Sequence, residues 1–237
     1  MPLWRYITAR VRREFPNAIF LLEGLGGAWE ITEQLLTEGG MQWAYSELFQ
    51  NYSGDQVSWY TDYALRQSQR MGLYVHYSET HDNMRLADKG AIWSLLRNRL
   101  CGLASVSGGF GFTCGVEWLA AERIVVHQRT GLNWGCETNI VDELARLTSL
   151  LAEHPCFFDG AKLERLSDPD STVFALERIS KSGDDRVLVL VNTDAEQGAT
   201  LTLDDSIWKS TEKFQVDLLQ QAFPEIEKHA NGTVTVT

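Results

Sequence analysis

The chain has 237 residues, which fits one large domain or one domain with a small module. Hydrophobic residues make up 44% and charged residues 22%, as in ordinary globular proteins with a sizeable core. The net charge of -11 argues against binding to nucleic acid or to an anionic membrane surface, because like charges repel. No run approaches the ~18 apolar residues of a membrane span. The first residues resemble no signal peptide, so we expect a cytoplasmic protein.

The cysteine spacing excludes two common metal or redox motifs. No pair of cysteines is spaced as Cys-x-x-Cys, so the chain carries no zinc-ribbon or thioredoxin-like signature. A disulfide framework is not expected in a chain of this size, and reduced thiols are the preferred interpretation. The cysteines concerned are Cys101, Cys114, Cys136 and Cys156.

The first two thirds of the chain alternate between helical and strand patterns. Residues 3–15 have apolar side chains at helical spacing and end before Pro16. Residues 18–22 form an unbroken apolar run, which is typical of a buried parallel strand. This order repeats about four times and predicts a parallel α/β sheet. Further helices are expected at 28–37, 55–70, 88–103 and 140–153, further strands at 41–45, 73–77 and 109–113, and a long loop at 115–138.

The pattern changes after Pro155. Short runs rich in β-branched residues are separated by turn-rich stretches, which predicts an antiparallel β module. We therefore divide the chain into an α/β part, residues 1–155, and a C-terminal all-β domain, residues 156–237. The strands expected in the second domain are 162–166, 172–179, 186–191 and 199–203.

Polar residues follow the predicted strands where those strands end. Glu23 comes directly after the first apolar run, and His81-Asp82 follows the third strand. In parallel α/β folds, active sites lie at the carboxyl ends of the strands. A carboxyl group near apolar walls can act as a general acid, and a His-Asp pair can bind vicinal sugar hydroxyls. The alternatives are a Glu that caps the next helix and an Asx-turn at Asp82.

Other site types are poorly supported. The Gly-x-Gly after Glu23 lacks the third glycine of a dinucleotide fingerprint, because Trp29 stands there. The chain has no Gly-x-Ser-x-Gly nucleophile elbow. One polar cluster matches no known pattern of metal ligands, so we expect neither a metal nor a cofactor. That cluster consists of His76, Glu79, His81 and Asp82.

Together, the two polar sites resemble the α-amylase superfamily of retaining α-glucoside hydrolases and transferases. In that family the acid/base Glu ends barrel strand five, as in Leu21-Leu22-Glu23-Gly24, and a His-Asp motif ends strand seven, as in Thr80-His81-Asp82-Asn83. Asp82 lies 59 residues after Glu23, which suits two intervening strand–helix steps. Residues 109–118 resemble the family's eighth strand with its Gly-x-Glu.

The resemblance implies a fold and a set of roles. The fold would be the last four βα units of a (β/α)8 TIM-type barrel, followed by a small antiparallel β-sandwich. Glu23 would be the acid/base, and Asp82 would be the carboxylate that stabilises the transition state. The substrate would be an α-glucan or oligosaccharide. The residues that would bind it or orient its partners are His81, Asn83, Arg85, Tyr45 and Trp118, with Trp43 as a further stacking candidate.

One departure from the family matters for activity. The family's nucleophilic Asp ends strand four, but no Asp precedes Glu23 in this chain. Half a barrel also leaves an unpaired strand edge and an open core. We therefore expect a segment of a longer enzyme that is inactive alone and self-associates through its open edge. A glucan-transferring enzyme and a non-catalytic carbohydrate-binding or assembly protein remain alternatives.

Overall fold

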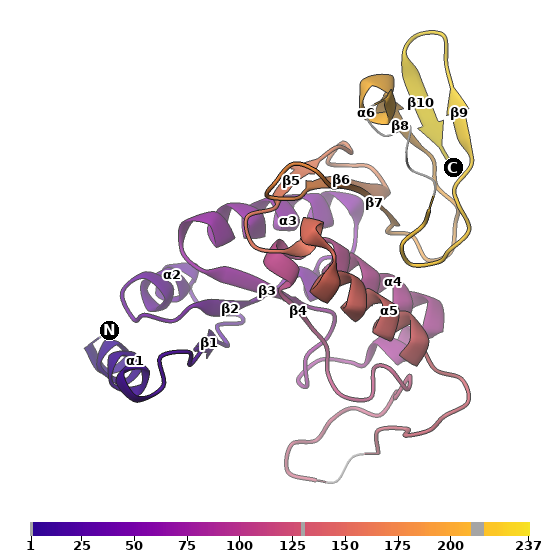
Figure 1. The fold of residues 1–237 in the computed structure, drawn as a ribbon. Coiled ribbons are helices and arrows are strands. Elements are labelled where there is room, and N and C mark those ends of the chain that lie inside the picture. Colours follow the sequence, from indigo (N-terminus) through magenta and orange to yellow (C-terminus); the bar gives the residue numbers. More distant parts are fainter. Residues whose placement is uncertain (1, 129–130, 210–215) are drawn as a thin grey trace.

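The computed structural model describes residues 2–128, 131–209 and 216–237 (Figure 1). A four-stranded sheet with the order β1-β2-β3-β4 forms the centre, and each neighbouring pair of its strands is parallel. Helices alternate with these strands along the chain, as the sequence predicts. The strands are β1 (Leu21–Leu22), β2 (Trp43–Ser46), β3 (Leu73–Tyr77) and β4 (Phe110–Gly111). The helices are α1 (Pro2–Glu14), α2 (Trp29–Thr37), α3 (Gly54–Arg70), α4 (Ala91–Leu103) and α5 (Val141–Glu153).

Local sequence explains where the helices begin and which face they bury. Ser53 and Gln56 form a capping box at the start of α3, so two otherwise unpaired donors are satisfied. Asn139 accepts a hydrogen bond from the Val141 amide at 3.2 Å and so serves the start of α5. The helix α5 buries Leu144, Leu147 and Leu151, which recur at helical spacing. The predicted helix boundaries are thus confirmed to within a few residues.

Two antiparallel sheets follow α5. The first has the order β5-β6-β7 and the second has the order β8-β10-β9. The four predicted strands are confirmed, whereas the sequence patterns did not predict β9, β10 or α6. The first sheet contains β5 (Lys162–Arg165), β6 (Val173–Ile179) and β7 (Arg186–Asn192). The second contains β8 (Leu201–Asp204), β9 (Ile226–Lys228) and β10 (Thr233–Val236), and α6 (Asp205–Lys209) follows β8.

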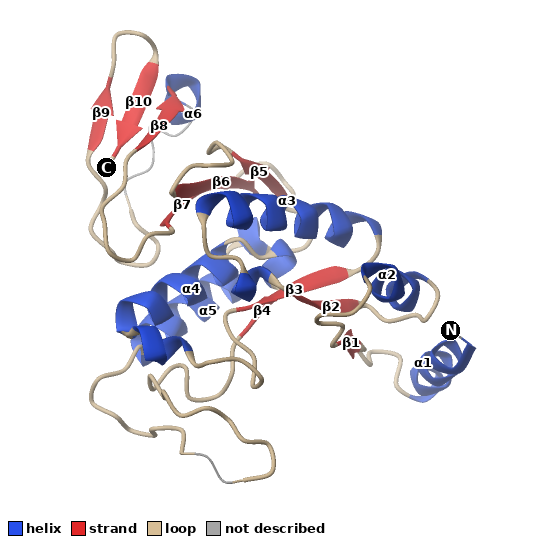
Figure 2. Ribbon diagram, turned by 180° about the vertical axis from the view of Figure 1, so that it is seen from behind, coloured by secondary structure: helices blue, strands red, loops and turns tan. Residues whose placement is uncertain are grey.

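The helices α3 and α4 join the parallel sheet to the β5–β7 sheet. Figures 1 and 2 show α3 between the two sheets. Side chains along β6 alternate in direction, as a strand requires. Phe174 and Leu176 belong to the main apolar core, whereas Val173 and Ala175 pack with Leu203 of β8. The main apolar core therefore contains residues of both the α/β part and the β5–β7 sheet, whereas β8 packs in a second cluster.

The edge strand β1 departs from its prediction. Only Leu21 and Leu22 of the run 18–22 form the strand itself, although the Phe20 carbonyl accepts a hydrogen bond from the Trp43 amide at 3.2 Å. Leu21 is 39% exposed rather than buried. The reason is that β1 pairs only with β2 and has no neighbour on its other side among the described residues. The helix α1 is similarly open, since Thr8 is the only residue that it buries. The prediction of a buried first strand is therefore wrong for this chain.

Two further expectations concern the whole chain. All four cysteines lie in the described part and are free, as predicted. Within the described residues, we find no helix with the length and apolar character to cross a membrane. The long loop expected at 115–138 contains neither helix nor strand where it is described, and its residues 129–130 lie outside the described ranges.

Candidate active site

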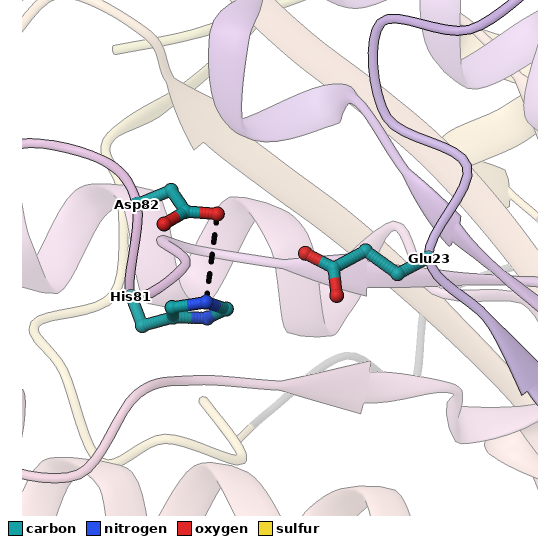
Figure 3. A group of neighbouring side chains, drawn as sticks. All are labelled: Glu23, His81 and Asp82. Atoms are coloured by element: carbon teal, nitrogen blue, oxygen red, sulfur yellow. Dashed lines mark ion pairs between the residues drawn. The ribbon is translucent and has the colours of Figure 1, made fainter. Parts of the chain in front are cut away.

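The ends of β1 and β3 bring three predicted site residues together. Because the strands are parallel, their carboxyl ends meet at one edge of the sheet. Glu23 follows β1, while His81 and Asp82 lie in the turn after β3 (Figure 3). One ligand atom from each of these three side chains lies within 4.8 Å of the other two. Residues far apart in sequence thus form one polar group.

The three side chains are open to solvent to different degrees. The His81 side chain is 40% exposed and the Asp82 side chain 69% exposed, and His81 Nε2 lies 3.5 Å from Asp82 Oδ2. Glu23 is also exposed. A ligand can therefore reach all three. Such a group could accept a divalent cation through its two carboxylates and imidazole, although exposed acidic groups are common without an ion.

Glu47 holds the turn that follows Glu23. Its Oε1 accepts a hydrogen bond from the Gly26 amide at 3.0 Å. The Glu47 amide itself donates to the Tyr60 hydroxyl at 2.6 Å, which fixes Glu47 against α3. Glu47, at the end of β2, thereby positions the loop that follows β1. The sequence indicated only that Glu47 follows a strand, and it did not reveal this partner.

Two tyrosines lie beside the acidic group. The rings of Tyr45 and Tyr77 have centroids 4.3 Å apart and planes inclined by 36°. Gly111 on β4 makes room for them, because a Cβ at that position would lie 2.6 Å from the Tyr77 ring. Burial raises the pKa of Tyr77 to about 12, and the neighbouring Tyr45 and the negative charge of Glu23 act in the same direction. Tyr77 is therefore a site neighbour that the sequence analysis missed.

A buried ion pair lies beneath the His81-Asp82 turn. Arg85 Nε is 2.8 Å from Glu79 Oε1, and these side chains are 1% and 2% exposed. The other Glu79 oxygen accepts a hydrogen bond from the Leu86 amide at 2.7 Å. Burial raises the pKa of Glu79 to about 7, against the opposing effects of the Leu86 amide and of Arg85.

Two of the predicted substrate-binding residues instead take part in holding this turn. Arg85 is buried and donates through Nη2 to the Cys114 carbonyl at 2.9 Å. The Asn83 side-chain oxygen accepts a hydrogen bond from the Thr80 hydroxyl. The Asn83 amide also donates to the Thr80 carbonyl at 3.2 Å. These contacts favour positioning over direct contact with a sugar.

The two tryptophan candidates lie in different parts of the fold. Trp118 follows β4 in the long loop and packs edge-on against Trp134, with ring centroids 6.2 Å apart. Trp43 begins β2 and lines a hollow of about 1070 Å³ together with Leu73 and Lys162. Since β2 runs from Trp43 towards the site, Trp43 lies at the far end of the strand and not beside Glu23.

His76 precedes the turn but takes no part in the exposed group. It is fully buried, and its Nδ1 lies 2.6 Å from the Ser46 hydroxyl. Burial lowers the pKa of His76 to about 4, so the ring is neutral at physiological pH. His76 therefore joins β2 and β3 inside the sheet and is unavailable to a ligand.

The group can carry out proton transfer and charge stabilisation at one place. Glu23 can give and take a proton, Asp82 supplies a negative charge, and His81 can donate a hydrogen bond to a hydroxyl. The Tyr45 and Tyr77 rings add an aromatic wall beside Glu23. Such an arrangement suits a polyhydroxylated ligand with a bond to be protonated.

Comparisons with known proteins agree with this architecture. An α-amylase structure from Lactobacillus plantarum aligns with 98% of this chain at a TM-score of 0.65 and 14% identity. A noncanonic maltogenic α-amylase, AmyB, from Thermotoga neapolitana aligns with 85% of it at a TM-score of 0.63 and 17% identity. An Anoxybacillus α-amylase, described as representing a new glycosyl hydrolase subclass, aligns with 98% at a TM-score of 0.69 and 15% identity.

Comparison of the sequence alone identifies no relative. Neither a protein-family model nor a curated protein matches the chain. The alignments cover 57%, 48% and 52% of the three solved chains, so this chain spans about half of their length. At such low identity the likeness concerns the fold. The chain therefore has the fold of part of an α-amylase, with a parallel sheet followed by antiparallel sheets.

Proposed function

We propose that this chain is part of a retaining α-glucoside hydrolase or transferase that acts on α-glucans or oligosaccharides. The observation that carries the proposal is the convergence of Glu23, His81 and Asp82 within 4.8 Å at the carboxyl edge of the sheet. The order and spacing of these residues in the sequence resemble those of the α-amylase superfamily. The α-amylase-like fold supports the same interpretation.

In the proposed mechanism each residue has one task. Glu23 protonates the glycosidic oxygen as the bond breaks and then accepts a proton from the attacking water or sugar hydroxyl. Asp82 stabilises the positive charge that develops on the sugar ring. His81 donates a hydrogen bond to a ring hydroxyl, and Tyr45 offers its face for stacking. The exposure of Glu23, His81 and Asp82 favours ligand access.

A retaining mechanism also needs a nucleophile. No Asp precedes Glu23 here, whereas the family places that Asp one strand earlier. We propose that a further part of the protein supplies it, and that the present chain alone does not turn over substrate. The match to only about half of three α-amylase chains supports this arrangement.

The same comparison supports a proposal for the architecture. Residues 1–155 would be the second half of a (β/α)8 barrel, and residues 156–237 would form a β-sandwich. The open β1 edge would then be the surface on which the barrel closes. Without its complement, this edge would favour self-association of the chain, because apolar side chains are exposed along it. The most exposed large apolar side chains in the segment from α1 to α2 are Leu3, Tyr6, Phe15, Ile19 and Trp29.

Binding and turnover should be measured separately. We expect the chain to bind maltoheptaose in calorimetry and to release no reducing sugar from it. Asp82→Asn should weaken binding of acarbose, a pseudo-oligosaccharide with a basic nitrogen, more than binding of maltoheptaose. Asp62→Asn, in an ion pair between α3 and β5, is the matched control. Turnover by the chain would contradict the need for an outside nucleophile, and failure to bind either sugar would contradict the proposed function.

Assays of a longer protein that contains this segment would distinguish a hydrolase, a transferase and a non-catalytic protein. Products formed with an added acceptor sugar would distinguish a transferase from a hydrolase. Sugar binding without turnover in that longer protein would favour a non-catalytic carbohydrate-binding or assembly role.

A further inference from the structure

We propose that Glu79 and Arg85 are positioning residues that hold the His81-Asp82 turn in place, although neither touches the ligand. The inference rests on the proposed function, because it gives the pair a role in presenting His81 and Asp82 to a sugar. It concerns two residues that follow the same strand and enclose the turn between them in the sequence.

The pair closes the turn at its base. Glu79 begins the turn and Arg85 ends it, and their charged atoms lie 2.8 Å apart. The second Glu79 oxygen binds the Leu86 amide at 2.7 Å, so one carboxylate holds both the side chain and the backbone of the returning segment. Within this closed loop, the Asn83 amide donates to the Thr80 carbonyl at 3.2 Å.

The same pair fixes the turn to the neighbouring strand end. Arg85 Nη2 donates to the Cys114 carbonyl at 2.9 Å, and the Thr113 hydroxyl donates to the Glu79 carbonyl at 3.2 Å. Both partners lie directly after β4. Gly115 leaves space for this contact, because a Cβ there would lie 3.0 Å from Arg85 Nη2. The turn is therefore positioned against β4 as well as β3.

Because Glu79 and Arg85 are both buried, each side chain depends on the other as its partner. With side chains only 1% and 2% exposed, neither charge can be satisfied by solvent if its partner is removed. His81 and Asp82, in contrast, are 40% and 69% exposed. Apart from their mutual contact, Asp82 accepts a hydrogen bond at its carbonyl from the exposed Arg123 Nη2 at 3.3 Å. The exposed residues thus depend on the buried pair for their position.

The test uses three variants of the whole chain: Glu79→Gln, Arg85→Met and the double variant. Glu79→Gln leaves the buried Arg85 charge unpaired, and Arg85→Met leaves a buried carboxyl group without its partner, so both should lower stability. Hydrogen exchange of the Asn83 backbone amide, followed by NMR, should accelerate by about 10-fold or more. The His81 imidazole signals, assigned with His81→Gln, should shift in both variants. Asp62→Asn, which removes a carboxylate from the Arg165 ion pair, should change neither readout.

The double variant separates positioning from stability alone. It contains no unpaired buried charge, so its unfolding midpoint should recover towards the wild-type value. It also lacks the contact to Cys114, so Asn83 exchange should remain fast and the His81 signals displaced. Recovery of both signals together with stability would overturn the proposal. Unchanged exchange in the single variants would overturn it too.

A sugar-binding measurement distinguishes a failure of the positioning role from a failure of the proposed function. If the wild-type chain binds no maltoheptaose while Asn83 exchange responds as expected, the proposed function fails and the positioning role stands. If the wild type binds and the Glu79 and Arg85 variants bind equally well with unchanged exchange, the positioning role fails alone.

Discussion

The two carboxylate-bearing ends of the sheet are held very differently. Glu23 follows the edge strand β1, and its turn is held by a hydrogen bond from the Gly26 amide to Glu47 and one from the Gly27 amide to the Gly24 carbonyl at 3.3 Å. Asp82 follows β3, which lies between β2 and β4. Its turn rests on the buried Glu79–Arg85 pair.

A neighbouring strand can thus hold the turn at the end of the next strand in place, and not only pair with that strand. The segment that follows β4 gives the Asp82 turn two hydrogen-bond partners, Thr113 and Cys114. The outer side of β1 has no equivalent among the described residues, and Leu21 there is 39% exposed. We therefore expect the β3 side to be rigid in this chain and the β1 side to become equally rigid only with a further neighbour. Four predictions test this contrast.

The largest effect should come from removing buried apolar volume near β3. Leu100 on α4 is 0% exposed, so Leu100→Ala should lower the free energy of unfolding by about 2–5 kcal/mol. Leu21→Ala on the edge strand should cost less than about 1 kcal/mol, because Leu21 is already partly in water. Urea unfolding followed by circular dichroism measures both. Equal losses would show that the edge is as well packed as the centre.

His76 should make the centre of the sheet sensitive to acid. Its pKa is lowered to about 4 in the fold, whereas an unfolded histidine takes up a proton below about 6.5. This stabilising contribution is complete above pH 6.5 and is lost as the pH falls towards 4, by on the order of 3 kcal/mol. His76→Gln should be less stable at neutral pH and should lose this part of the pH dependence. Urea unfolding of the two proteins at pH 7 and pH 4.5 measures it, and parallel losses would contradict the prediction.

The exposed side of α1 should promote self-association. Leu3 and Tyr6 are 66% and 69% exposed, so replacing both by Glu should raise the dissociation constant by about 10-fold or more. Analytical ultracentrifugation and light scattering measure the change. Val126→Glu, at a site 64% exposed in the long loop, should have little effect. A wild-type chain that remains monomeric at high concentration would refute the open-edge interface.

The smallest effect concerns the tyrosines beside Glu23. The pKa of Tyr77 is raised to about 12, chiefly by burial and then by Tyr45. Tyr45→Phe should therefore lower it slightly, and Glu23→Gln should lower it by less. Carbon NMR of labelled tyrosine during an alkaline titration can follow this one residue. An unchanged pKa in Tyr45→Phe would mean that the Tyr45 hydroxyl does not act on Tyr77 in solution.

Strong local patterns predicted much of the fold. β3 is found at 73–77 as expected, because a run of apolar and aromatic residues between a helix and a polar turn leaves little choice. β9 and β10 were missed because they are short and part of their stabilisation comes from pairing across a long connection. The exposure of β1 could not be read from its apolar run, since burial depends on which neighbours surround a strand.

The candidate site, like the fold, could be predicted from the sequence only in part. The order and spacing of Glu23, His81 and Asp82 identified the group, because the ends of parallel strands must meet at one edge. The partners of each residue could not be foreseen. Arg85 was expected to bind substrate or to orient a nearby carboxylate, and it is buried against Glu79, which the sequence suggested only as a possible metal ligand.

The sequence by itself determined the alternation of strands and helices, the antiparallel module that follows them, and the residues at the strand ends. These features depend on local periodicity and on chain order. Only the tertiary structure decided that one turn is held by a buried ion pair and that the strand carrying Glu23 lies at an open edge. Burial and charge pairing arise between residues from different elements, and their free energies depend on a desolvation that no single segment of the chain contains.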